Sequence, residues 1–101
     1  MHTNKVLDQF EDYLESRGYK KETPSGSRST AYDYSHIRIP FVLKEEGIDV
    51  LELLIEIDRY VMMYDIGGDK EMLGAKSHRS VINALKRFRE FNIDIQHKMN
   101  K

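Results

Sequence analysis

The chain has 101 residues, which is enough for one domain and too few for two. Its 16 Lys and Arg residues against 17 Asp and Glu residues give a formal charge of −1, which excludes a generic polycation that coats nucleic acid. No cysteine is present, so disulfides, thiol nucleophiles and Cys-containing metal sites are excluded. Because the sequence contains neither an uncharged apolar run of bilayer length nor a signal-like start, we expect one soluble, cytoplasmic domain over residues 1–101.

The apolar residues recur with the helical period, which predicts an all-α protein, a compact bundle of four or five helices. The first helix is expected over residues 3–17, with Gly18 at its end. Residues 20–28 contain Pro, Gly and Ser without any apolar residue, so they predict a mobile loop. A second helical region follows over residues 29–46. Pro40 predicts either a kink in it or two short helices, the second opened by Pro40. Its expected apolar face consists of Tyr34, Ile37 and Phe41.

A third helix is expected over residues 49–64, because Asp49 followed by Glu52 resembles a capping box and Gly67-Gly68 can end the helix. It carries a broad apolar face and a second apolar stripe. Such a helix is either central in the bundle or half-exposed and available to a partner. The broad face comprises Val50, Leu53, Leu54, Ile57, Tyr60, Val61 and Tyr64, and the second stripe comprises Leu51, Ile55 and Met62.

The fourth helix is expected over residues 77–92, with Ser77 as its N-cap and a frayed tail at about residues 96–101. Its core face is predicted to be Val81, Ile82, Leu85 and Phe88, with Ala84 and Phe91 at the margin. The core of the whole domain is predicted to contain Phe10, Leu14, Leu54, Ile57, Val61, Leu85 and Phe88.

Charge is segregated along the chain. Residues 47–70 hold six acids and two bases, whereas residues 71–101 hold seven bases and three acids. On the fourth helix Arg79, Asn83 and Lys86 form one stripe, whose groups suit phosphates and base edges. The alternative is an ordinary solvated face, with Lys and Arg complementing the helix dipole. The residues predicted to bind DNA are Lys20, Lys21, Arg28, Lys76, Arg79, Asn83, Lys86 and Arg89.

The sequence contains none of the common catalytic or metal-binding motifs considered below. The four histidines form no His-x-x-x-His or His-Glu-x-x-His pair, and the glycines lack the Gly-Lys-Ser/Thr ending of a phosphate loop. Ser35-His36 and Ser77-His78 are adjacent pairs that point about 100° apart on a helix, so neither makes a nucleophile–base dyad. We therefore expect a protein that is not an enzyme, with no cofactor and no metal.

A series of packing residues resembles a known family. Phe10-x-x-Tyr13-Leu14-x-x-x-Gly18-Tyr19 comes first, then Tyr34 and Ile37, and then Ile57-Asp58-Arg59-Tyr60-Val61. The final segment, from Ser77 through Val81-Ile82-Asn83-Ala84-Leu85 to Phe88 and Phe91, is similar to the closing helix of that family. In this order, over residues 4–92, the series resembles the SAM-like core-binding domain at the N-terminus of tyrosine recombinases and phage integrases. A similar helical module precedes some restriction-type and HNH nucleases.

The resemblance implies a four-helix domain that clamps one side of duplex DNA while a separate domain performs the chemistry. This chain departs from the family in the Pro24-Ser25-Gly26-Ser27 insertion, in Pro40 and in its weaker basic character, and it has no room for the recombinase catalytic residues. We therefore expect a stand-alone DNA-binding module from a phage or mobile element. The alternative is a module that binds a protein partner, or a second copy of itself, through Leu51, Ile55 and Met62.

Overall fold

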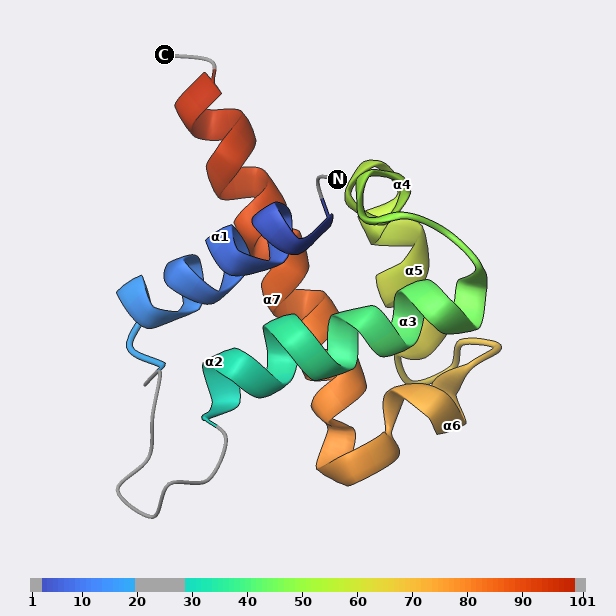
Figure 1. Ribbon diagram of the computed structural model, residues 1–101. Helices are drawn as coiled ribbons and strands as arrows, with labels where there is room; N and C mark the ends of the chain where they lie inside the picture. The colour runs from blue at the N-terminus through green and yellow to red at the C-terminus, as the bar shows by residue number, and fades with distance from the viewer. Residues whose placement is uncertain (1–2, 20–28, 100–101) are drawn as a thin grey trace.

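The computed structural model describes residues 3–19 and 29–99 (Figure 1). This part of the chain is helical and contains no strand, which confirms the all-α prediction for it. None of its helices is both long enough and apolar enough to cross a membrane. The loop predicted at 20–28 lies outside the described residues. In chain order the elements are α1 (Thr3–Ser16), α2 (Thr30–Tyr32), the π-helix η1 (Asp33–Arg38), α3 (Ile39–Glu46), α4 (Val50–Ile55), α5 (Ile57–Tyr64), α6 (Glu71–Gly74) and α7 (Lys76–Met99).

Helix α7 is the central element of the fold. It contacts α1, η1, α3, α4, α5 and α6, and Figure 1 shows it passing behind α1 and α3 with its C-terminal end projecting beyond the bundle. The Phe88 ring meets the Phe10 ring of α1 edge-on, with 4.9 Å between the ring centroids. The predicted core face of this helix is confirmed, and Ala84 and Phe91 belong to the core and not to its margin. The buried residues of α7 are Val81, Ile82, Ala84, Leu85, Phe88 and Phe91.

The predicted start of this helix is wrong. Ser77, His78 and Arg79 have φ angles of 53°, 58° and 66°, so the chain makes a left-handed turn before the regular helix. The Ser77 carbonyl accepts a hydrogen bond from the Ser80 hydroxyl at 2.7 Å. The left-handed conformation raises the energy of each non-glycine residue by roughly 1–2 kcal/mol, and three follow one another here. No pattern in the sequence predicts this turn. At the other end the helix continues to Met99, further than the expected extension of about one turn past Ile93.

The second helical region continues through Pro40 as one rod. Arg38 and Ile39 both have right-handed helical φ and ψ, and α3 begins at Ile39 with the proline in its first turn. Because a proline has no N–H, the carbonyl four residues earlier loses its α-helical donor. The π-helix η1 lies directly before this missing donor, and in it the Ile39 N–H donates to the Tyr34 carbonyl, five residues earlier. The second predicted alternative, a helix opened by Pro40, is therefore closer to the structure than a kink.

The buried face of this rod differs from the predicted one. The expected face of Tyr34, Ile37 and Phe41 is wrong, because all three side chains are only half-buried. Tyr34 and Phe41 still pack against the core, but they lie at the edge of the fully buried face. The buried residues of the rod are Ala31, Ser35, Ile39 and Val42.

The predicted third helix is two helices. Asp49 caps α4 as expected, because its carboxylate accepts the Glu52 N–H at 2.8 Å. The backbone leaves the helical region at Glu56, with φ −106° and ψ 26°, and α5 starts at the next residue. Leu53 is buried, whereas Leu54, which was predicted in the core, is only partly buried. The rest of the predicted broad face is buried, namely Val50, Leu53, Ile57, Tyr60, Val61 and Tyr64.

The segment between α5 and α7 folds back tightly and includes the short helix α6. A Cβ atom on Gly74 would lie 1.8 Å from the Tyr64 carbonyl oxygen, so only glycine permits this approach. Nearby, the Glu46 carboxylate accepts hydrogen bonds from the Tyr64 hydroxyl at 2.7 Å and from the Lys70 ammonium at 2.5 Å. This clasp joins the end of α3 to α5 and to the turn before α6.

Replacing Leu85 with alanine tests the central position of α7. Leu85 is fully buried, so Leu85→Ala should lower the free energy of unfolding by about 2–5 kcal/mol. Urea unfolding measures the change, and Met72→Ala at an exposed position is the matched control. A loss below roughly 1 kcal/mol would mean that this face of α7 is not packed.

The Glu46 clasp predicts a pH-dependent contribution to stability. Burial alone would raise the pKa of Glu46, but the hydrogen bonds from Lys70 and Tyr64 outweigh it and hold the pKa below its ordinary value of 4.5. Ionised Glu46 therefore stabilises the fold above pH 4.5, and this stabilisation is lost as the pH falls through the lowered pKa. Glu46→Gln should cost roughly 1–2 kcal/mol at pH 7 and much less at pH 3.

Urea unfolding at both pH values measures this difference. Glu45→Gln is the control, because Glu45 is exposed and next in the chain. If Glu46→Gln lowered the free energy of unfolding equally at the two pH values, ionised Glu46 would not be the source of the stabilisation.

Candidate functional site

The residues predicted to bind DNA do not form a free helical face. Every residue of α7 from Arg79 to Asn92 is buried or half-buried, because other helices pack around this part of the helix. A recognition helix must present an exposed face to enter the major groove. The middle of α7 is therefore only partly exposed, with the Arg79 and Lys86 side chains 40% and 29% exposed.

Two of the predicted residues meet at a single carboxylate. The Arg79 guanidinium lies 3.5 Å and the Lys86 ammonium 3.2 Å from Asp65, which follows α5. The Ile66 backbone N–H also donates to Asp65, and together with Lys86 it holds the pKa of Asp65 below its ordinary value. Arg89 lies beside Lys86 along a shallow concave surface next to Gly67-Gly68. We call Arg79, Lys86 and Arg89 the basic cluster.

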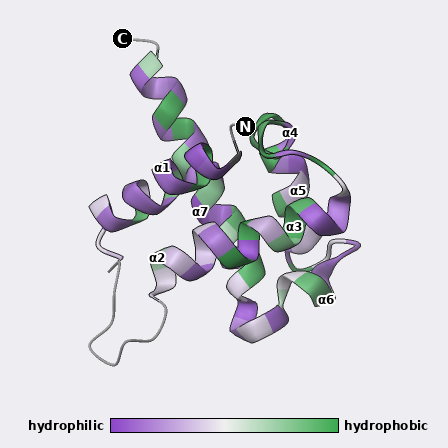
Figure 2. Cartoon of the chain, in the orientation of Figure 1, coloured by the Kyte–Doolittle hydropathy of each residue, from purple (hydrophilic) through white to green (hydrophobic). Residues whose placement is uncertain are grey.

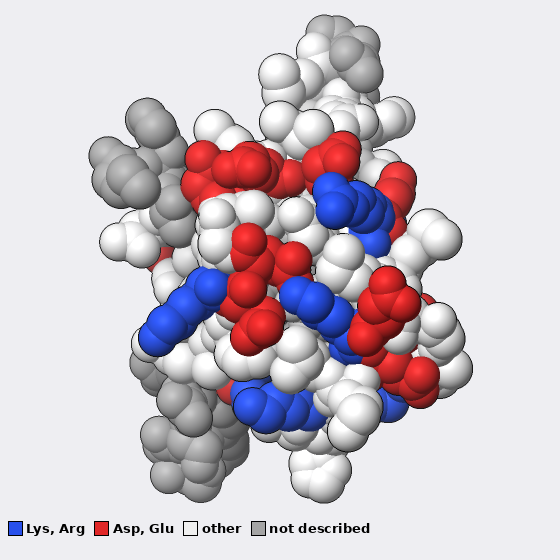
Figure 3. Space-filling view, turned by 90° about the vertical axis from the view of Figure 1, so that its right-hand side faces the viewer, with Lys and Arg blue, Asp and Glu red and all other residues white. Residues whose placement is uncertain are grey.

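The remaining predicted residues lie elsewhere. Asn83 is half-buried, while the Lys76 ammonium lies 5.1 Å from the centre of the Phe41 ring. Lys20, Lys21 and Arg28 are outside the described residues. Figure 3 shows Lys and Arg interspersed with Asp and Glu over the face it presents, without a continuous basic area. Within the part of the chain that the structure describes, the basic cluster is the piece of the predicted stripe that comes together.

The second apolar stripe is exposed. Burial of this stripe by a central third helix is wrong, because α7 occupies the centre. The alternative, a surface available to a partner, stays open. Ile66, in the turn after α5, is exposed as well. The exposed fractions are 50% for Leu51, 78% for Ile55, 73% for Met62 and 71% for Ile66. Figure 2 shows α4 coloured largely as hydrophobic.

These four residues form two pairs. Leu51 and Ile55 lie one turn apart on α4, whereas Met62 of α5 and Ile66 of the following turn line one shallow concave surface. Exposed acids accompany them, since Glu52, Glu56 and Asp58 all lie in the same stretch of chain. We call Leu51, Ile55, Met62 and Ile66 the apolar surface.

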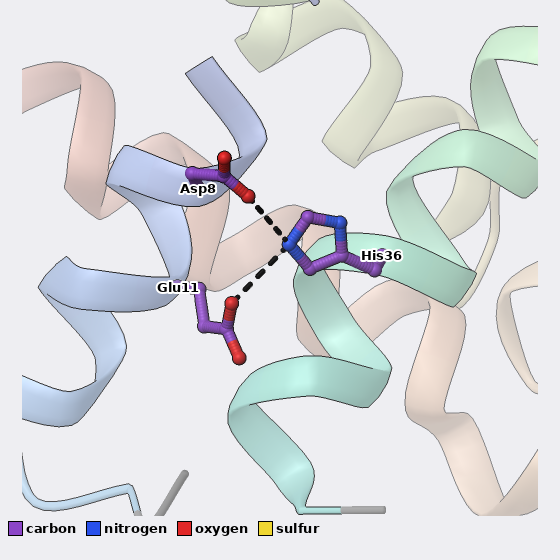
Figure 4. Close-up of side chains that lie close together, drawn as sticks. All are labelled: Asp8, Glu11 and His36. Carbon is purple, nitrogen blue, oxygen red and sulfur yellow. Dashed lines mark ion pairs between the residues drawn. The ribbon is translucent and has the colours of Figure 1, made fainter. Parts of the chain in front are cut away.

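A third group of side chains joins α1 to η1. The His36 Nε2 atom lies 3.2 Å from an Asp8 oxygen and 3.2 Å from a Glu11 oxygen (Figure 4). Asp8 and Glu11 are three residues apart on α1 and therefore share one side of that helix. The His36 ring stacks on Tyr32 with 5.1 Å between centroids. The group offers one imidazole nitrogen and two carboxylates, the donor types that divalent metals use in proteins.

Sequence reasoning missed this group because it looked for two histidines on one helix. Here the donors come from two elements that are distant in the chain. The i, i+3 carboxylates beside the apolar face of α1 are visible in the sequence, but the contact of α1 with η1, which brings His36 to them, is a tertiary feature that residue spacing does not reveal.

No protein-family model, curated protein or solved structure matches the chain. The described fold supports the all-α class of the expected core-binding domain. The finer resemblance to recombinases remains a prediction from the residues alone.

Proposed function

We propose that this protein is a helical binding module that docks a protein partner on its apolar surface. The observation that carries this proposal is the exposure of Leu51, Ile55, Met62 and Ile66 within residues 51–66. Exposed large apolar side chains that lie close together mark interaction sites more often than single ones do, and Leu51/Ile55 and Met62/Ile66 are two such pairs. Helical partners recognise such surfaces through anchors spaced by three or four residues.

The free energy available from apolar burial indicates how tightly a partner can bind. Burying four such side chains contributes roughly 6–12 kcal/mol. Losing translational and rotational freedom costs about 4–15 kcal/mol, so the apolar contacts alone give weak binding. Charge complementarity around the apolar anchors must therefore assist.

The surrounding charge favours a basic partner. Residues 47–70 carry six acids and two bases. Of the two bases, Arg59 lies 3.8 Å from Glu56 and Lys70 is paired with Glu46. A second copy that presented the same surface would bring like charges together. We therefore infer that the partner is an amphipathic helix with apolar residues four apart and flanking Lys or Arg.

Selection from a displayed library of helical peptides tests this partner chemistry. Peptides retained by the wild-type protein should share apolar residues at i, i+4 and an excess of Lys and Arg. The best peptide, once synthesised, should lose at least about tenfold in affinity for Ile55→Glu, because the substitution places a charge in the interface. Met72→Glu is the matched control, since Met72 is an exposed methionine on α6.

Three outcomes would contradict the proposal. They are the absence of any enriched peptide, a selected peptide that binds Ile55→Glu as tightly as wild type, and an equal loss for Met72→Glu. Dimers detected by light scattering that Ile55→Glu dissociates would assign the surface to a second copy instead.

The basic cluster supports a second candidate, weak binding of duplex DNA. Arg79 and Lys86 share the carboxylate of Asp65, and Arg89 lies beside them on the concave surface, so these three cations and one acid leave a positive excess. Phosphates can replace Asp65 as partners of Arg79 and Lys86. The resemblance to the core-binding domain points to the same ligand.

Substitutions at the cluster test DNA binding by fluorescence anisotropy on a labelled duplex at several salt concentrations. Arg79→Ala combined with Lys86→Ala should flatten the slope of log K against log salt by about 2, one phosphate contact for each charge removed. Asp65→Asn should instead raise the affinity, because it frees both cations. Lys5→Ala combined with Lys44→Ala removes two exposed charges elsewhere and is the control.

Wild-type protein that binds no duplex at tens of micromolar would contradict the DNA candidate. Equal slopes for the cluster variant and the control variant would also contradict it. Neither result decides the peptide-docking proposal, whose test measures peptide affinity at Ile55 of α4, although Met62 and Ile66 share the concave surface with Lys86 and Arg89.

A further inference from the structure

We propose that Asp8, Glu11 and His36 bind one divalent transition-metal ion, with Zn²⁺ as the representative case. The site lies between α1 and η1 and involves none of the residues of the apolar surface or the basic cluster. It is therefore independent of the function proposed above.

The distances suit such an ion. Zinc lies about 2.0–2.2 Å from nitrogen and oxygen ligands, which places neighbouring ligand atoms about 3.0–3.5 Å apart in tetrahedral or octahedral geometry. The His36 Nε2 atom lies 3.2 Å from each carboxylate oxygen, and all three donor atoms lie within 4.8 Å of one another. Small movements of the three side chains would therefore bring their donor atoms to the distances needed to coordinate one ion.

The donor set selects the class of metal. One imidazole nitrogen with two carboxylates is a borderline set that suits Zn²⁺ and its neighbours in the first transition row. Calcium and magnesium prefer ligand sets made entirely of oxygen. Two carboxylates also neutralise the ion, and water can complete the coordination sphere, as in open zinc sites.

The surroundings hold the ligands and leave a path to solvent. The His36 ring is fixed by stacking on Tyr32 and by its place in the π-helix, a feature that is frequent at functional sites. The Glu11 side chain is 12% exposed, whereas that of Asp8 is 68% exposed and gives an ion access. A bound ion would join α1 to η1 and so stabilise the contact between them.

The same contacts also fit a protonated His36 held by two carboxylates, without any metal. Calorimetric titration of chelator-treated protein with zinc chloride separates the two arrangements. A metal site predicts binding at one ion per chain and an increase in Tm when zinc is added, because the ion binds the folded state. An ion pair predicts neither effect.

Variants assign the ligands. Asp8→Asn lies at an exposed position and should leave the fold intact, yet it should weaken zinc binding by at least about tenfold and abolish the increase in Tm. His36→Gln keeps a side chain of similar size and should have the same effect. His97→Gln is the matched control, because His97 is exposed near the end of α7 and should leave zinc binding unchanged.

The proposal is overturned if the wild-type protein binds no zinc at about 100 µM, which would leave an ion pair only. It is overturned equally if Asp8→Asn and His36→Gln bind zinc like wild type, or if His97→Gln loses as much affinity as they do. Titration with Co²⁺ adds a spectroscopic check. Its visible absorption should indicate mixed nitrogen and oxygen ligation in wild type and disappear in Asp8→Asn.

Discussion

The contact between Phe10 of α1 and the aromatic residues of α7 determines the arrangement of the other helices. Phe10 lies 4.9 Å from Phe88 and 5.4 Å from Phe91 between ring centroids, and all three rings are buried. Such a cluster buries a large apolar area and also fixes the angle at which the rings meet. Helix α7 also contacts η1, α3, α4, α5 and α6, which makes it the centre of the bundle. The side of α4 and α5 that carries Leu51, Ile55 and Met62 faces the solvent.

Periodicity predicted much of this core from the sequence. Phe10, Leu14, Leu85 and Phe88 were expected inside and are fully buried, because a helical wheel needs only regular geometry to be correct. The errors begin where the backbone departs from the α-helix. The π-helix before Pro40, the break at Glu56 and the left-handed turn at Ser77–Arg79 each change which residues point inward. Only the proline gives a local signal, and it does not specify the form of the adjustment.

The candidate sites were harder to predict than the core for a different reason. A helical wheel places Arg79 and Lys86 on one side of a helix, but it cannot show that Asp65 lies opposite them. It likewise identified Leu51, Ile55 and Met62 as a second stripe without showing which helix would be central. The carboxylate–histidine group needs two elements and a π-helix to form. In each case the missing information is tertiary contact between segments that are distant in the chain.

The fold brings part of the acidic segment of the chain into contact with the basic segment. The acidic segment supplies Asp65 to the basic face of α7, so part of the positive charge is neutralised within the molecule. Another acid, Glu46 at the end of α3, binds Lys70 in the same way. The exposed Glu52 and Asp58 remain beside the apolar side chains of α4 and α5. Because internal pairing weakens the basic face of α7 while the exposed acids of α4 and α5 keep their charge, this balance supports the proposal of a basic protein partner more than that of nucleic acid.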